Sequence, residues 1–131
     1  MEQPIPSGVR STMLIHSIAM LIFSLNYLLL PVWWGDLTGC LSNQVPQVFR
    51  LFGTAILGYA ISSFLAYREN IWGNAKITVQ MNCIITALFP IVLVLGLLVW
   101  ELPSIGWMYF VVMLGFAISF NYFYFKERNI S

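Results

Sequence analysis

The stretch ITVQMNCIITALFPIVLVLGLLV, residues 77–99, decides the fold, because it is long, strongly apolar and free of charged side chains. It lies within a run of 24 uncharged residues between Lys76 and Glu101. A helix needs about 20 apolar residues to cross a hydrocarbon core of about 30 Å, at a rise of about 1.5 Å per residue. The sequence therefore predicts a transmembrane helix over residues 77–99.

Three other uncharged runs lie outward from this stretch. They hold 25 residues between Arg10 and Asp36, 17 between Arg50 and Arg68, and 24 between Glu101 and Lys126. These runs predict transmembrane helices at about 11–31, 47–67 and 104–125. The first apolar run is long for a signal peptide, and no cleavage motif of small residues follows it, so we expect it to stay attached. The expected fold is an all-α, integral membrane, antiparallel four-helix bundle.

The composition of the chain supports lipid as its solvent. Of 131 residues, 60% are hydrophobic and 8% are charged, whereas about 25% of the residues of a soluble domain are charged. A water-soluble chain of this size could not bury so much apolar surface. We expect a single transmembrane domain over residues 1–131, in which residues 1–10 form a short, poorly ordered cytoplasmic lead. The net charge of +1 comes with no basic stripe, so nucleic acid is not an expected partner.

The basic residues near the ends of the spans predict the orientation. If both chain ends are cytoplasmic, five basic residues lie on the cytoplasmic side, namely Arg10, Arg68, Lys76, Lys126 and Arg128. Only Arg50 then lies on the other side. Because cytoplasmic loops retain positive residues, we expect a multi-pass protein of the cell membrane with both termini inside.

Arg50, at the outer end of the second span, is the most conspicuous polar group. Its nearest possible counter-ions are Asp36 in the preceding loop and Glu101 in the other external turn. Either carboxylate could form a partly desolvated ion pair with Arg50, held by two parallel hydrogen bonds. The alternative is that Arg50 extends to lipid phosphates.

Small residues continue the helical row on which Arg50 lies. They are Thr54, Gly58, Ser62 and Ala66, at intervals of four. Small side chains let two membrane helices approach closely. We therefore expect this row to make the second span the packing centre of the bundle.

A polar layer is predicted near the cytoplasmic side. His16, Gln80, Asn82 and Asn121 lie at similar depths, about 5–9 Å from the inner interface at a rise of 1.5 Å per residue. One hypothesis is interhelical hydrogen bonding. The other is a pocket that faces the cytoplasm and accepts a proton, a quinone-like head group or a small solute, with His16 as the titratable member.

Reactive constellations are scarce in this sequence. The carboxylates fall at the two surfaces, with Asp36 and Glu101 outside and Glu2, Glu69 and Glu127 on the cytoplasmic side, and no cluster of Cys, His, Asp or Glu has the spacing of metal ligands. No nucleophile has a base within reach. We expect no catalytic site, no metal site and no cofactor, and hence no enzyme. Small multidrug exporters share the size and the four-helix plan, but the first span lacks the membrane-embedded glutamate on which their coupling depends.

One segment resembles a known group of proteins. Residues 50–60 read RLFGTAILGYA and follow a first helix that ends in Leu30-Pro31. This start of Arg, apolar residue, aromatic residue and Gly is similar to the second helix of uncharacterised prokaryotic four-helix membrane proteins. The resemblance covers about a fifth of the chain and implies a fold, with no function attached.

Three functions are compatible with these features. The leading hypothesis is a non-catalytic accessory or structural subunit of a homo-oligomer or a larger membrane complex, because soluble mass and reactive groups are nearly absent. The first alternative is a small transporter or channel-forming protomer that uses the cytoplasm-facing polar layer. The second alternative is a membrane protein that binds a lipid or a cofactor. In each case the expected partners are the bilayer and other membrane chains.

Overall fold

The computed structural model describes residues 3–39, 46–99 and 102–128, the side chains of the last range as far as Lys126. Within these ranges the chain is all-helical, as predicted. Its helices are α1 (Ser7–Leu29), α2 (Pro31–Thr38), α3 (Pro46–Arg68), α4 (Trp72–Val99) and α5 (Gly106–Arg128). Apart from one isolated β-bridge between Pro4 and Ile71, the described ranges hold no β structure.

The four long helices, α1, α3, α4 and α5, are long and apolar enough to cross a membrane. They agree with the four predicted spans, with ends that differ by at most five residues. The largest difference is at the start of α4, which begins at Trp72, ahead of the charged Lys76. A charge marks where lipid contact ends, and a helix can continue beyond it into the polar interface.

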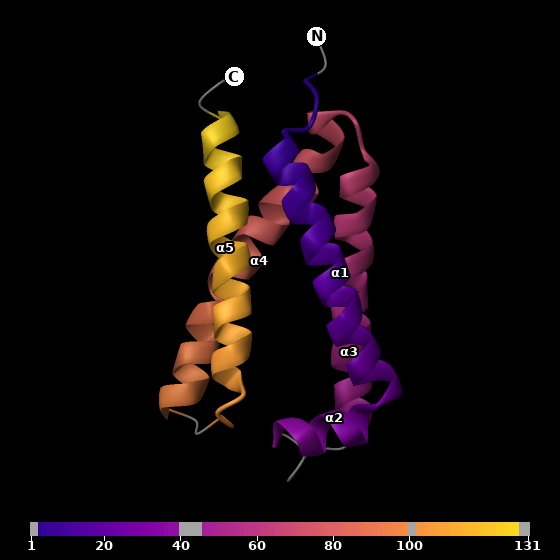
Figure 1. Ribbon diagram of the computed structural model, residues 1–131, viewed down its shortest axis with the longest axis vertical. Helices are drawn as coiled ribbons and strands as arrows, with labels where there is room; N and C mark the ends of the chain where they lie inside the picture. The colour runs from indigo at the N-terminus through magenta and orange to yellow at the C-terminus, as the bar shows by residue number, and fades with distance from the viewer. Residues whose placement is uncertain (1–2, 40–45, 100–101, 129–131) are drawn as a thin grey trace.

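The short helix α2 lies where the sequence analysis expected an external loop. Pro31 occupies its first turn, where a missing N–H costs nothing. Gly39 ends it in the left-handed conformation, with φ of 70°, and its N–H is 3.3 Å from the carbonyl oxygen of Asp36. Pro31, the last residue of the first predicted span, therefore starts a second helix, and Gly39 ends it. In Figure 1, α2 lies across the end of the molecule opposite to both chain ends.

The long helices are arranged as two antiparallel pairs. The most extensive packing joins α1 to α3 and α4 to α5, while the contacts between the pairs are fewer. Figure 1 shows the pairs close together at the end that carries both termini and apart at the end where α2 lies. The structure is thus a splayed bundle.

The segment before α1 differs from the poorly ordered lead expected for residues 1–10. The N–H of Trp72 donates to the carbonyl of Gln3 at 2.8 Å, and the N–H of Ile5 donates to the carbonyl of Asn70 at 3.3 Å. Prolines favour extended backbone, and the turn between α3 and α4 has free groups with which an extended segment can bond. Residues 3–6 therefore fasten the start of α1 to this turn, and the helix itself begins at Ser7.

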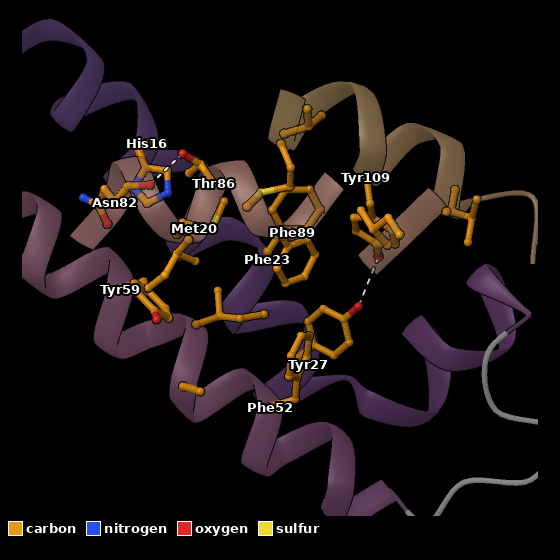
Figure 2. Close-up of a pocket in the computed structure, with 18 of the residues that line it drawn as sticks. His16, Met20, Phe23, Tyr27, Phe52, Tyr59, Asn82, Thr86, Phe89 and Tyr109 are labelled. Carbon is orange, nitrogen blue, oxygen red and sulfur yellow. Dashed lines mark hydrogen bonds between the residues drawn. The ribbon is translucent and has the colours of Figure 1, made fainter. Parts of the chain in front are cut away.

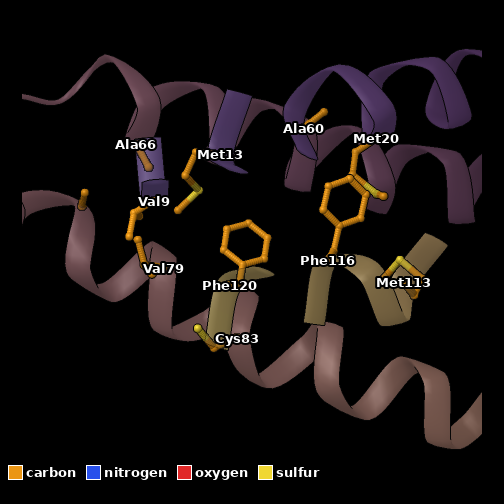
Figure 3. Packing of buried hydrophobic residues seen from close by; sticks show 11 residues of the cluster. Val9, Met13, Met20, Ala60, Ala66, Val79, Cys83, Met113, Phe116 and Phe120 are labelled. Atoms are coloured by element: carbon orange, nitrogen blue, oxygen red, sulfur yellow. The ribbon is translucent and has the colours of Figure 1, made fainter. Parts of the chain in front are cut away.

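The buried core lies where the two pairs meet. Its members come from every long helix and include Val9, Met13, Ala66, Val79, Cys83, Phe116 and Phe120. Figure 3 shows Phe120 and Phe116 of α5 pointing at the other helices, with Met13 and Met20 of α1 beside them. Large apolar side chains on the outward faces are exposed, as expected for helices surrounded by lipid.

Of the predicted row Thr54, Gly58, Ser62 and Ala66, only Ala66 is among the buried positions of α3, and the close approach of α1 and α3 is at Gly53. A Cβ at Gly53 would lie 2.8 Å from the Cβ of Tyr27 and 3.1 Å from the backbone nitrogen of Leu28. By contrast, Thr54 and Gly58 are exposed, and nothing lies within 4 Å of a Cβ at Gly58. An α-helix has 3.6 residues per turn, so a contact row alternates steps of three and four instead of keeping a strict step of four. Buried positions on α3 are Phe49, Gly53, Ala60, Ser63 and Ala66.

Candidate functional site

A cavity of about 260 Å³ lies between the two helix pairs. Side chains from α1, α3, α4 and α5 line it, together with residues 102, 103 and 105 just before α5. Its walls are almost entirely apolar, and none of the described lining residues is Asp, Glu, Lys or Arg. Figure 2 shows polar groups at its two ends and the rings of Phe23 and Phe89 between them.

The inner end of the cavity is built on Ser63, which is fully buried. Its Oγ is 2.9 Å from Nδ1 of His16 and accepts a hydrogen bond from Nδ2 of Asn82 at 3.1 Å. One hydroxyl thus joins α1, α3 and α4. The Asn82 amide also lies 3.5 Å from the sulfur of Met13, and the Thr86 hydroxyl donates to the main-chain oxygen of Asn82 at 2.6 Å.

Aromatic rings of α5 hold the imidazole of His16 in place. The rings of Phe116 and Phe120 meet it edge to face, with centroids 4.8 Å and 5.2 Å away. His16 is 2% exposed in total and is also one of the residues that line the cavity. The only surface that it presents is therefore directed at this inner end.

The outer end is closed by hydroxyls and an indole. Tyr27 donates to the hydroxyl of Tyr109 at 3.3 Å, and Trp34 Nε1 donates to the same oxygen at 3.1 Å. Tyr109 thereby joins α5 to both α1 and α2, and the dashed line in Figure 2 marks its bond to Tyr27. Tyr27 and Tyr109 line the cavity, so its outer boundary is also polar.

The predicted inner layer is brought together only in part. His16 and Asn82 meet through Ser63, as described above. Gln80, however, donates to the Tyr124 hydroxyl at 2.7 Å, and Asn121 donates to the carbonyl of Ala117 in its own helix at 2.8 Å. Equal depth does not bring side chains together, because residues two apart on a helix point in nearly opposite directions.

Sequence reasoning missed Ser63 and Thr86. Ser63 is adjacent to Ser62, which was placed in the small-residue row and whose hydroxyl donates to the Tyr59 carbonyl in its own helix at 3.0 Å. The signal that could have found Ser63 is the buried face given by Phe49, Gly53 and Ala60. That face appears only when steps of three and four are both allowed.

Arg50 is exposed at the outer end of α3. Its Nη1 donates to Oε1 of Gln47 at 3.3 Å. Within the described part of the chain no ion pair joins it to Asp36, which is exposed on α2. The other proposed counter-ion, Glu101, lies outside the described residues.

The described residues of this site offer apolar surface and uncharged polar groups. In the ranges that the structure describes, no group of three or more His, Cys, Asp or Glu converges on one point. The cavity offers an apolar body, one inner polar end and one outer polar end. The transporter hypothesis gains no specific support here, because two of its four polar residues bond elsewhere.

Fold and site together define a helical chain of the multi-pass membrane type with an apolar cavity between its helix pairs. Comparison with known proteins adds no relative: no family model, no curated protein and no solved structure matches the chain. The function is therefore argued from the cavity itself.

Proposed function

We propose that the chain is a membrane protein that holds one hydrophobic molecule of the bilayer between its two helix pairs. The observation that carries this proposal is the cavity of about 260 Å³ with almost wholly apolar walls. Binding pockets for small molecules combine such walls with a few placed polar groups. Here those groups are Ser63 with its two partners at one end and the tyrosines at the other.

The size and direction of the cavity favour a chain-like ligand. Water takes about 30 Å³ per molecule in the liquid, so the cavity itself has room for about nine non-hydrogen atoms, and a longer chain would extend through its open side. His16 and Tyr27 both line it and are eleven residues apart on α1, a rise of about 16 Å. This length is about half of a hydrocarbon core of about 30 Å. The ligand would thus lie along the membrane normal, with one end in the leaflet that holds Tyr27.

The orientation of the chain decides which leaflet this is. We propose that both termini are cytoplasmic, which the positions of Arg10, Arg68, Lys76 and Lys126 support. These residues lie near the helix ends that share the side of the two chain termini (Figure 1). With this orientation the tyrosine end of the cavity lies in the outer leaflet.

The test uses a bulky side chain to fill the cavity. Ala55 and Ala87 are both exposed, but only Ala55 lines the cavity, so Ala55→Phe and Ala87→Phe form a matched pair. The chain is purified in mild detergent, native mass spectra are recorded, and the bound molecules are extracted and identified. We expect wild type and Ala87→Phe to carry a bound apolar molecule that Ala55→Phe lacks. Equal occupancy in the two variants, or none in wild type, would contradict the proposal.

A role as a subunit is the second candidate. It is favoured by the outward side of α3, where Thr54 and Gly58 are exposed and a Cβ at Gly58 meets nothing within 4 Å. Small outward residues allow a helix of another chain to approach. A Gly58→Cys variant in native membranes should then form a cross-linked species, while Phe64→Cys, at an exposed position about 120° around α3 from Gly58, should not. Cross-linking that is equal at both positions would argue against a specific interface.

A further inference from the structure

The donors and acceptors at the inner end of the cavity can be counted. Ser63 has one O–H, and Asn82 already donates to its oxygen. The acceptor within reach of the Ser63 hydroxyl is Nδ1 of His16, at 2.9 Å. The hydroxyl therefore donates to Nδ1, and a neutral imidazole that accepts at Nδ1 carries its proton on Nε2. The hydrogen-bond network thus makes Nε2 of His16 a donor.

Two atoms at this end have no partner in the described part of the chain. One is the Nε2–H of His16, and the other is the side-chain oxygen Oδ1 of Asn82. Both residues are 2% exposed and both line the cavity. No side-chain nitrogen or oxygen that is itself buried lacks a partner among the described residues, so these two atoms face the open space of the cavity. A polar atom that faces apolar surroundings without a hydrogen bond costs up to about 1–3 kcal/mol. A ligand atom that bonds to either group would remove part of this cost.

The same surroundings exclude a charged head group. The described lining residues offer no carboxylate, ammonium or guanidinium as a counter-ion. A charge placed deep in a bilayer without a partner costs at least about 2.5–3.5 kcal/mol. Moving a carboxylate, phosphate or quaternary ammonium head group from the membrane surface into the cavity would carry this free-energy penalty, whereas moving a head group with an uncharged oxygen would not.

Selectivity must come from this polar end. Lipid chains are as apolar as the cavity walls, so an alkyl chain that moves from the bilayer into the cavity gains little from the hydrophobic effect. The aromatic middle of the cavity can therefore accept many different alkyl chains but does not select strongly among them. A head group that bonds with His16 or Asn82 separates one ligand from the surrounding lipid.

We propose that the ligand is an uncharged single-chain amphiphile with an oxygen head group, a hydroxyl or a carbonyl. This proposal rests on the proposed function above. The head oxygen lies at the inner end and accepts a hydrogen bond from His16 Nε2–H, and a hydroxyl can also donate to Asn82 Oδ1. The chain extends past Phe23 and Phe89 toward Tyr27 and Tyr109.

The test compares probes of one chain length with different heads. Decane, decan-1-ol, decan-2-one and decyltrimethylammonium are added to the purified chain at fixed detergent, and the thermal unfolding midpoint is measured. The same titrations with Ala55→Phe are the control for effects of each probe on the detergent micelle. We expect decan-1-ol and decan-2-one to raise the unfolding midpoint of wild type by more than they raise that of Ala55→Phe. Decane should do so only at about three- to tenfold higher concentration, and decyltrimethylammonium should not do so at all.

A His16→Phe variant tests whether the head group binds at His16, because it keeps an aromatic ring and removes the Nε2–H donor. Its preference for decan-1-ol and decan-2-one over decane should disappear, while its binding of decane remains. Asn82→Leu is a second variant in case His16→Phe does not fold, and it should weaken decan-1-ol more than decan-2-one. The probe series on wild type is informative without either variant.

The outcomes separate the two proposals. If all uncharged probes shift wild type equally and Ala55→Phe abolishes the shift, the head-group inference is overturned and the proposed function stands. If no probe shifts wild type more than Ala55→Phe, the proposed function fails. A stronger shift with the cation, or an unchanged preference in a folded His16→Phe, would also overturn the inference.

Discussion

Gly53 and Gly58 lie on one helix, but only Gly53 lies where two backbones approach each other. A methyl group at Gly53 would be 2.8 Å from the Cβ of Tyr27, whereas one at Gly58 would meet nothing within 4 Å. Gly53→Ala should therefore lower the free energy of unfolding by about 1–3 kcal/mol, the usual cost of overpacking. Denaturation by sodium dodecyl sulfate from mild detergent, followed by circular dichroism, measures this change.

Gly58→Ala is the matched control for this substitution. It carries the same gain in helix propensity, up to about 1 kcal/mol, without the clash. We expect its stability to equal or exceed that of wild type. If both variants lose stability to the same extent, the close approach of α1 and α3 at Gly53 is not present in the folded protein.

Ser63 offers a second contrast within α3. Ser63→Ala removes the hydroxyl that joins His16 to Asn82, and hydrogen bonds between membrane helices contribute about 0.6 kcal/mol on average and up to about 1.7. We expect a loss of about 1 kcal/mol in the free energy of unfolding, measured by the same denaturation. Ser62→Ala removes only a bond within its own helix and should lose less. A larger loss for Ser62→Ala would contradict the bridge.

These pairs show what the sequence could and could not predict about the site. His16 and Asn82 were identified because polar groups in an apolar span need partners. Which neighbours they would meet depends on the rotation of each helix about its axis. An error of one residue turns a helix by about 100°, which is enough to exchange Ser63 for Ser62. In an amphipathic helix the polar face shows which side is buried. Uniformly apolar helices have no such face, so the sequence does not reveal an error in the assumed rotation.

At the level of elements, the long helices were predictable because the length of an apolar run is set by the thickness of the bilayer. Helix α2 was not, because its eight residues are too few for such a signal and its Gly and Asp resemble those of a loop. The bridge between residues 3–6 and the turn after α3 was missed for a related reason. This bridge pairs backbone groups, and no pattern of side chains in the sequence predicts such a pairing.

The end of α2 supplies a prediction at this scale. Gly39 has φ of 70°, a conformation that costs a residue with a Cβ roughly 1–2 kcal/mol. Gly39→Ala should therefore loosen α2, with faster hydrogen exchange in residues 31–38, as read by mass spectrometry. Gly39→Asn is the control, since Asn tolerates this conformation better, and its exchange should stay closer to wild type. Equal acceleration in both variants would show that the effect has another cause.

Across the whole molecule, packing is concentrated at the end that carries the termini. The core of Val9, Met13, Val79 and Phe120 holds the two helix pairs together there, and the pairs separate toward α2 (Figure 1). The cavity occupies the space that this separation opens. Its existence could not be predicted from the sequence, because an apolar side chain that lines a cavity and one that faces lipid obey the same solvation rule.

The orientation of the molecule leads to the last prediction. The basic residues Arg10, Arg68, Lys76 and Lys126 lie near the end shared by the termini, so this end should be cytoplasmic. Asp36 on α2 and Asn74 at the start of α4 are both exposed and lie at opposite ends. In a C40S/C83A background, a maleimide that cannot cross membranes should label Asp36→Cys on intact cells. It should label Asn74→Cys only after permeabilisation.

The reverse pattern would invert the orientation and move the tyrosine end of the cavity into the cytoplasmic leaflet. Partial labelling at both positions on intact cells would instead mean that the chain inserts both ways, which contradicts an orientation set by its basic residues. Either result leaves the contacts within the chain unchanged, because those contacts do not depend on which side of the membrane they face. The result changes the leaflet from which a ligand reaches His16 and Asn82, and with it the lipids available to the site.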